Sequence, residues 1–295
     1  MTGLRGWSCA TGQASRGVST RHAGVRAPLV GLALVVAASL AAAPYELQTP
    51  RGPGPFVTVL AVHGGGWTSG TPADTAPFCR AVLEAGFACA ALDYRLAPQT
   101  PFPGQIDDLT RAIHDLMRDA ARLRLNPAGV VLAGESAGGH LAAFLGAEHP
   151  STLPILGVIA FSPPLDLEAL GEPGRALGIT PPEVRALTGA AGWSASDIER
   201  MRRASPVDAI RPGAPPFLIV FGTADSLVPP SQARGFCDRL RHTGGSCQLL
   251  PIPGAPHGLW AEDRFERWKS VWYPTLIDWI QRLAAPPLPK TPDPR

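Results

Sequence analysis

From Phe56 onward, short apolar runs alternate with longer segments of helical periodicity, and this alternation limits what the chain can fold into. The runs are apolar at nearly every position, which is typical of strands buried on both faces of a parallel sheet. The sequence therefore predicts an α/β fold, a mostly parallel sheet flanked by helices. The expected strands are FVTVLAV at 56–62, FACAAL at 87–92, GVVLAG at 129–134, ILGVIAF at 155–161, FLIVFG at 217–222 and CQLLPI at 247–252.

The segments between these runs divide into regular helices and one irregular insertion. The stretch 162–216 breaks the rhythm with scattered prolines and glycines, so we expect a lid there. The folded domain should cover 44–283. A tail follows at 284–295, where prolines fix φ and remove donors and so exclude a regular element. Helices are expected near 73–85, 105–124, 137–148, 231–242 and 265–283.

Residues 1–43 contain neither Asp nor Glu, and four arginines precede an apolar run from Leu29 to Ala43. A basic start, an apolar stretch and small residues at its end are typical of a cleaved signal peptide. The run has about 15 residues, which is short for a membrane span of about 20. We therefore expect a periplasmic or secreted protein. A retained membrane anchor and a cytoplasmic location are the alternatives.

The charge balance bears on the kind of partner. Lys and Arg number 26 against 24 Asp and Glu, which gives a formal net charge of +2. The sequence has no lysine-rich run and no basic stripe with interleaved aromatic residues, as a nucleic-acid-binding surface would have. We therefore expect a small-molecule partner and no nucleic acid.

Ser136 lies directly after an expected strand and directly before an expected helix, inside a G-x-S-x-G pattern formed with Gly134 and Gly138. A sharp strand-to-helix turn with small flanking residues exposes such a hydroxyl above the end of the sheet. The start of the following helix also favours developing negative charge. This context predicts a nucleophile. The alternative is that Ser136 only caps the helix.

A serine hydroxyl is a weak nucleophile near neutral pH, so it needs a base and a group that orients the base. On a fold of this kind the partners follow the serine in the order acid, then histidine, on loops after later strands. Asp225 and His257 each stand just beyond an expected strand, and they are the predicted acid and base. Asp166 is the alternative acid, and Asp225 could instead be a plain loop cap. The remaining histidines fall in or beside expected helices or near the N-terminus, except His63.

The motif HGGGW at 63–67 follows the first long apolar run. Its glycines let backbone N–H groups approach a substrate oxygen, and such donors stabilise the oxyanion of an acyl-transfer intermediate. We predict that the donors are the N–H groups of Gly65, Gly66 and Ala137. His63 should brace this loop, while Trp67 and Trp260 either pack in the core or line a pocket.

These motifs together resemble those of the α/β-hydrolase superfamily, in particular the hormone-sensitive-lipase-like and acetyl-esterase-like carboxylesterases. The resemblance implies hydrolysis of carboxylic esters, usually with short acyl chains, through an acyl-enzyme and without metal or cofactor. It assigns Ser136 as nucleophile, His257 as base and Asp225 as its orienter, and it suggests that Asp93 and Arg95 tie loops together. The matching stretches are HGGGW, DYRLAP at 93–98, GESAGGHLA at 134–142, APPFLIVFGTADSLVP at 214–229 and IPGAPHG at 252–258.

One departure from this family concerns the start of the fold. Its members begin with an antiparallel hairpin, but only Pro44 to Pro55 separates the expected signal from the first long run. We therefore expect the first strands to be missing and one sheet edge to lack protection. Three functions stay open: an esterase, an amidase or formamidase with the same triad, and a non-catalytic binding protein of this fold.

Four of the five cysteines form two pairs with the same spacing, Cys79 with Cys89 and Cys237 with Cys247. In each pair the first cysteine lies on an expected helix and the second on the following strand. Helix rise and strand rise place both at similar levels beyond the turn, so each pair could form a disulfide. The alternative is four small buried thiols.

Overall fold

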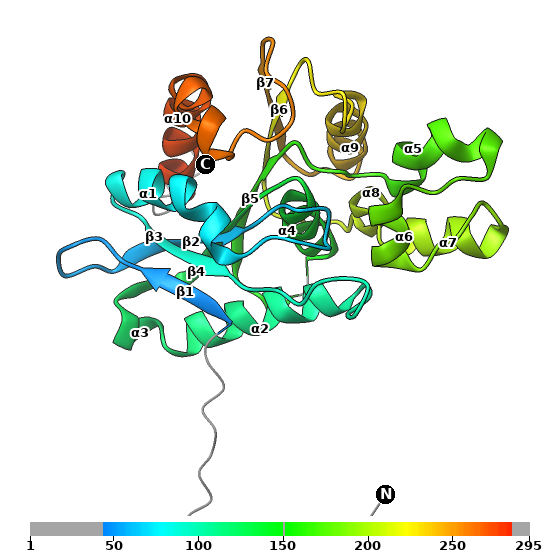
Figure 1. The fold of residues 1–295 in the computed structure, drawn as a ribbon. Helices are drawn as coiled ribbons and strands as arrows, with labels where there is room; N and C mark the ends of the chain where they lie inside the picture. The colour runs from blue at the N-terminus through cyan, green and yellow to red at the C-terminus, as the bar shows by residue number, and fades with distance from the viewer. Residues whose placement is uncertain (1–43, 150, 285–295) are drawn as a thin grey trace, which may run out of the picture. The chain divides into compact units, whose positions relative to one another are not determined.

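A seven-stranded sheet forms the centre of residues 44–149 and 151–284, which this computed structural model describes (Figure 1). The strand order is β1-β3-β2-β4-β5-β6-β7, and every neighbouring pair is parallel except β1 with β3. The predicted mostly parallel sheet is therefore confirmed. The strands are β1 Tyr45–Gln48, β2 Phe56–Val62, β3 Ala88–Leu92, β4 Leu125–Glu135, β5 Ile155–Phe161, β6 Phe217–Gly222 and β7 Cys247–Ile252.

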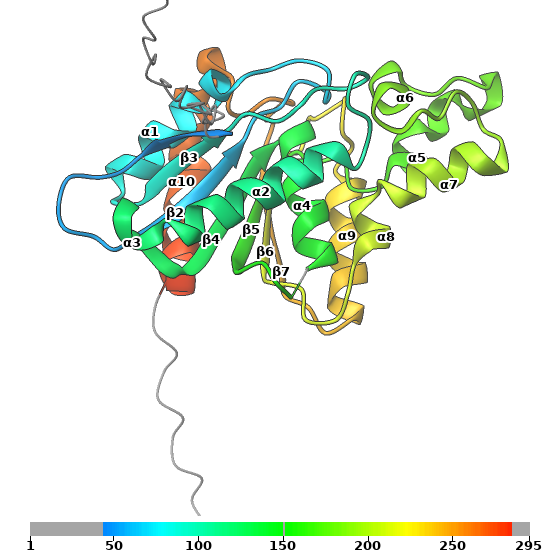
Figure 2. The same ribbon diagram turned by 90° about the horizontal axis from the view of Figure 1, so that it is seen from below.

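Helices cover both faces of this sheet, as the two views in Figures 1 and 2 show. Helices α1 (Ala76–Glu84) and α10 (Glu262–Ala284) pack on one face, and α2 (Gly104–Arg118), α4 (Ala137–Glu148) and α9 (Ser231–His242) pack on the other. The shorter helices are η1 Pro72–Thr75, α3 Ala120–Leu123, α5 Leu167–Gly171, η2 Glu172–Leu177, α6 Pro182–Thr188, α7 Ala195–Arg203 and α8 Pro206–Ala209.

The side chains of β2 show why the strands are apolar throughout. Leu60 and Val62 belong to the core under α2 and α4, whereas Val59 and Ala61 belong to the core under α1 and α10. All four are fully buried. Because successive side chains of a strand point to opposite faces, a sheet covered on both faces needs apolar residues at every position.

The expectation that the first strands are missing is wrong for one of them, because β1 precedes Phe56 and pairs antiparallel with β3 along that edge of the sheet. Tyr45 and Leu47 are half-buried against the core, while Glu46 and Gln48 are exposed. This alternation is the signature of a strand with one covered face. Its four residues are too few to stand out. The edge of β3 is consequently paired rather than open.

The insertion at 162–216 contains α5, η2, α6, α7 and α8, all of them short. Figures 1 and 2 show α5, α6 and α7 grouped in a lobe beyond α4 and α9. Val184, Leu187 and Met201 anchor this insertion in the hydrophobic core and are fully buried. That this insertion acts as a lid remains a prediction.

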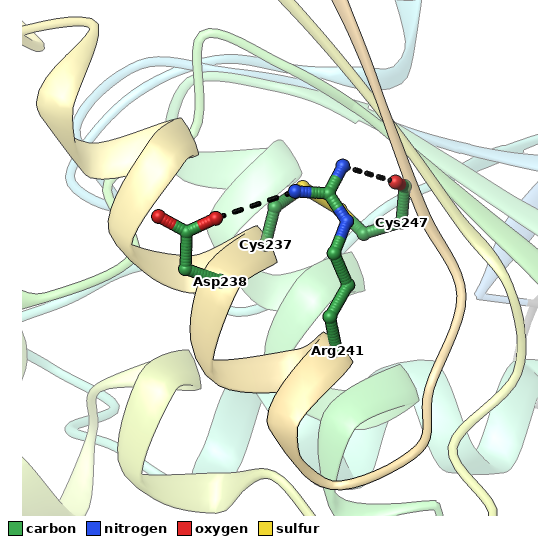
Figure 3. Close-up of a disulfide and its surroundings, with 4 residues drawn as sticks. All are labelled: Cys237, Asp238, Arg241 and Cys247. Atoms are coloured by element: carbon green, nitrogen blue, oxygen red, sulfur yellow. Dashed lines mark hydrogen bonds and ion pairs between the residues drawn. A yellow bond between two sulfur atoms is a disulfide. The ribbon is translucent and has the colours of Figure 1, made fainter.

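Both predicted disulfides are present, Cys79–Cys89 and Cys237–Cys247, each with a Cα–Cα distance of 5.4 Å. The first joins α1 to β3 and the second joins α9 to β7. Beside the second bridge, Arg241 donates to the Cys247 carbonyl oxygen at 2.7 Å and pairs with Asp238 (Figure 3). The bridge and the arginine together tie the edge strand β7 to its helix.

Replacing Cys237 and Cys247 together by alanine should lower the free energy of unfolding by roughly 3 kcal/mol, because a bridge spanning about ten residues limits the unfolded chain. Denaturant unfolding of oxidised protein would measure the loss. The native Cys79–Cys89 bridge closes a loop of the same length, so the matched double variant at Cys79 and Cys89 should lose a similar amount. Unchanged free energies of unfolding in both variants would show that the two disulfides do not stabilise the protein.

Among the residues that the structure describes, no helix is both long and apolar enough to cross a membrane. The expected signal peptide at 1–43 lies outside these residues. Of the expected tail at 284–295, only Ala284 is described, and it is the last residue of α10.

Candidate active site

The predicted site residues follow the carboxyl ends of parallel strands. Ser136 follows β4, at the middle of the sheet, while Asp225 and His257 follow β6 and β7. The chain leaves β2 toward α1 on one face and leaves its neighbour β4 toward α4 on the other. Ligands of open α/β sheets bind in the crevice that forms where neighbouring connections diverge in this way.

Ser136 has φ 53° and ψ −117°, an uncommon conformation for a residue with a side chain. Its N–H donates to the Phe161 carbonyl oxygen at 2.8 Å, which fixes the turn to β5. The turn is so tight that a Cβ on Gly134 would lie 2.3 Å from the Gly138 oxygen, and one on Gly138 would lie 2.1 Å from the Val62 oxygen. The glycines therefore permit the close approach that exposes the hydroxyl.

Ser136, His257 and Asp225 form one chain of hydrogen bonds. His257 Nε2 lies 2.9 Å from Ser136 Oγ, and His257 Nδ1 lies 2.8 Å from Asp225 Oδ2. The other carboxylate oxygen, Oδ1, accepts the N–H groups of Leu227 and Val228. Asp225 thus caps its own loop and also holds the imidazole, so the two interpretations of this residue are compatible.

The surroundings of Asp225 favour its ionised form. Burial alone would raise the pKa of this carboxyl, but hydrogen bonds from His257 and from the Val228 N–H lower the pKa below its ordinary value. The alternative acid, Asp166, is instead the N-cap of α5, where it accepts the Ala169 N–H at 2.9 Å. Asp225, and not Asp166, is therefore the buried carboxylate that contacts the imidazole of His257.

The three residues predicted to supply oxyanion donors line two different cavities. Gly66 and Ala137 line the same pocket as Ser136, whereas Gly65 lines a second cavity. Gly65 and Gly66 both have positive φ, 104° and 57°, so the loop turns in a way that glycine allows most easily. Of the three predicted donors, Gly66 and Ala137 consequently share a pocket with Ser136, and Gly65 does not.

The Ser136 pocket has a volume of about 280 Å³ and is lined by residues of the core and of the insertion at 162–216. Pro164, Leu170, Pro181 and Val184 come from the insertion. The volume falls just below the range of about 300–1,000 Å³ that is usual for drug-sized ligands. The pocket therefore suits a small, mostly apolar group next to the hydroxyl.

Glu135 is a site residue that the sequence did not single out. It precedes Ser136, its side chain is buried, and its Oε1 accepts the Trp260 N–H at 2.7 Å across 125 residues of sequence. This bond fixes the loop that carries His257. Burial raises the pKa of Glu135 to about 7, despite the opposing effect of the Trp260 hydrogen bond.

Glu135 gives a pH-dependent prediction. Its folded-state pKa lies above its ordinary value of 4.5, so folding favours the protonated carboxyl, and this stabilisation is lost as the pH rises through about 7. Glu135→Gln keeps an acceptor for Trp260 but cannot ionise. Its free energy of unfolding relative to wild type should therefore rise by roughly 3 kcal/mol between pH 4.5 and pH 8. Urea unfolding at both pH values measures this change.

The control for this experiment is Glu262→Gln, at an exposed residue that lines the second cavity together with Glu135. It should show no comparable change with pH. A flat difference between Glu135→Gln and wild type would contradict a buried, titrating Glu135.

The other residues singled out in the sequence have structural roles. His63 is buried, stacks on Tyr94 and contacts the Gly64 carbonyl, so it braces the loop as predicted. Trp67 is both core and pocket wall, and its indole N–H donates to His140 at 3.1 Å. Trp260 stacks on Phe78 and lines the second cavity.

The prediction that Asp93 and Arg95 tie loops together is half wrong. Arg95 pairs with Asp108 of α2 at 2.9 Å, and Asp108 is buried. Asp93 is exposed, and its side chain bonds to none of the described residues. Asp108 lies one helical turn inside an amphipathic helix, a position that gave no sign of this role.

A mostly parallel sheet, a serine on a sharp strand-to-helix turn, and an acid and a histidine after later strands define an α/β-hydrolase fold. The chain belongs to the BD-FAE family, whose family model matches residues 46–240. This assignment agrees with the superfamily expected from the motifs.

Individual relatives carry esterase names. Esterase LipC of Mycobacterium tuberculosis is 32% identical over 221 residues, which cover 69% of this chain and 53% of LipC. An acetyl-hydrolase of Streptomyces hygroscopicus is 31% identical over 60% of each chain. This chain spans about half the length of the curated mycobacterial relatives it matches.

Solved structures give the same fold. A thermophilic esterase from Thermogutta terrifontis superposes with a TM-score of 0.64 and 28% identity, covering 83% of this chain and 88% of that one. An acetyl ester-xyloside bifunctional hydrolase from Caldicellulosiruptor lactoaceticus reaches a TM-score of 0.69 at 20% identity, covering 81% and 88%. The second similarity supports the fold alone.

Proposed function

We propose that this protein hydrolyses carboxylic esters through an acyl-enzyme on Ser136. The observation that carries the proposal is the chain of hydrogen bonds from Ser136 through His257 to the buried Asp225. Membership of a family whose relatives are named esterases supports the same reaction.

In the proposed reaction, Ser136 Oγ attacks the ester carbonyl carbon while His257 Nε2 takes its proton. The N–H groups of Gly66 and Ala137 stabilise the resulting oxyanion. As the intermediate collapses, the C–O bond to the alcohol breaks and His257 gives its proton to the leaving oxygen. Water, deprotonated by His257, then attacks the acyl-enzyme and releases the acid and Ser136.

We further propose that short acyl chains are preferred, because the pocket beside Ser136 holds only about 280 Å³. A series of p-nitrophenyl esters of increasing acyl length tests this. The value of kcat/KM should peak at short chains and fall once the chain outgrows the pocket. A continuous rise toward long acyl chains would contradict the preference.

The same series separates the alternatives. Aryl formamides run beside the esters distinguish an esterase from a formamidase with the same triad. Absence of turnover on every ester and formamide would favour a non-catalytic binding protein of this fold.

We also propose that the protein is exported. The signal-like composition of residues 1–43 supports this, and so do the two disulfides, since disulfides persist in oxidising compartments. Fractionation of the native cells, with mass spectrometry of alkylated cysteines, tests it. Recovery in the cytoplasm with four free thiols would contradict export.

A further inference from the structure

The lid places one carboxylate on the wall of the Ser136 pocket. Glu183 stands in the first turn of α6 and is the one charged residue among those that line this pocket. Apart from Ser136 and the backbone of Gly66, the rest of the wall is apolar or aromatic: Trp67, Ala137, Pro164, Leu170, Pro181, Val184, Leu227 and Val228. A single charge on an apolar wall affects which ligand groups can bind there.

Glu183 lies directly against the oxyanion loop. A Cβ placed on Gly66 would come within 2.8 Å of Glu183 Cγ and 3.4 Å of its Cβ. The aliphatic part of the glutamate therefore rests on Gly66, whose N–H is a proposed oxyanion donor. This contact places the exposed Glu183 side chain beside the oxyanion loop, although α6 belongs to the insertion.

No arginine of the lid neutralises this carboxylate, because Glu183 takes part in no ion pair among the residues that the structure describes. The lid arginines that form ion pairs are bound to other acids. These pairs are Arg175 with Glu172, Arg200 with Asp197, and Arg202 with Glu168. The charge of Glu183 is therefore available to act on a bound substrate.

The position of His257 bears on which half of an ester would enter this pocket. His257 must protonate the leaving oxygen, so the alcohol has to lie on the histidine side of Ser136. His257 does not line the 280 Å³ pocket, whereas Gly66 and Ala137 do. We therefore assign the acyl chain to this pocket, next to Glu183, and the alcohol to the side of His257.

We propose that Glu183 is a specificity-determining residue that disfavours acyl chains with a negative end and favours neutral or cationic ones. This inference rests on the proposed ester hydrolysis. A negative acyl terminus would meet the Glu183 carboxylate across a pocket with no neutralising cation among its lining residues. Because Glu183 is exposed, water screens its charge, and we expect the charge of the acyl terminus to change kcat/KM by roughly tenfold.

Three p-nitrophenyl substrates test the proposal: the neutral valerate, the monoester of glutarate with a terminal carboxylate, and γ-(trimethylammonio)butyrate with a terminal cation. Glu183→Gln should raise kcat/KM for the glutarate roughly tenfold and lower it for the cationic ester by a similar factor. The valerate should change less than about twofold. Glu183→Lys should extend both trends. Glu172→Gln, a lid glutamate that does not line the pocket, should leave all three substrates unchanged.

The outcomes separate the inference from the proposed function. Equal changes on all three esters would mean that Glu183 only supports the oxyanion loop, and this would overturn charge selection while ester hydrolysis stands. Failure of the wild type to hydrolyse any of them would overturn both. The butyrate ester of para-hydroxybenzoate carries its charge on the alcohol, so Glu183→Gln should not affect it. A charge effect there instead would overturn the placement of the acyl chain.

Discussion

Ser136→Ala is expected to lower kcat for ester hydrolysis by roughly 10⁴- to 10⁶-fold, because it removes the proposed nucleophile. Among the residues that the structure describes, the hydroxyl bonds only to His257 Nε2, at 2.9 Å, so its loss breaks one hydrogen bond and opens no large cavity. The backbone N–H of residue 136 keeps its bond to the Phe161 oxygen. Stability should therefore remain close to that of the wild type, and steady-state kinetics beside a thermal unfolding curve measure both quantities.

A covalent label gives this prediction a second readout. A fluorophosphonate should modify wild-type protein at Ser136 and should not modify Ser136→Ala. The control is Ser231→Ala at the exposed start of α9, which should keep wild-type turnover and labelling. Folded Ser136→Ala with more than about a tenth of the wild-type rate would remove Ser136 from the mechanism.

The parallel strands and the candidate triad could be predicted from sequence because each left a local signal. A strand covered on both faces must be apolar at every position, as Val59 and Leu60 illustrate, so these runs stand out from the helices. Ser136, Asp225 and His257 each follow such a run. Because parallel strands run in the same direction, the three residues then meet at the carboxyl ends of the strands.

Other features depend on contacts between segments far apart in sequence. Glu135 bonds to Trp260, and Asp108 pairs with Arg95. The sequence around each carboxylate does not indicate which residue it will contact. Strand β1 alternates over only four residues and is recognisable once β3 lies beside it. Glu183 reaches the pocket because α6 folds back over Gly66, and the irregular insertion gave no sign of that path.

Asp225→Asn should lower kcat by roughly 10³- to 10⁴-fold, the size of effect that the same change has in other serine triads. Asparagine can still accept the N–H groups of Leu227 and Val228 through its oxygen, so the loop should keep its shape. Its amide nitrogen would then face His257 Nδ1, where the carboxylate Oδ2 lies 2.8 Å away in the native protein. Two donors cannot share that position. The imidazole would therefore carry its proton on Nε2, where it cannot accept the Ser136 proton.

Asp166→Asn is the matched control, because asparagine is as good an N-cap as aspartate and should still accept the Ala169 N–H. This variant should keep turnover within about twofold, the scale of a change that touches no group in the proton path. Steady-state kinetics on one short-chain p-nitrophenyl ester would compare the two variants. Loss of activity in Asp166→Asn with retention in Asp225→Asn would transfer the acid role to Asp166. Equal, small losses in both would mean that His257 needs no carboxylate to hold its tautomer, and the bond to the buried Asp225 would then serve the loop alone.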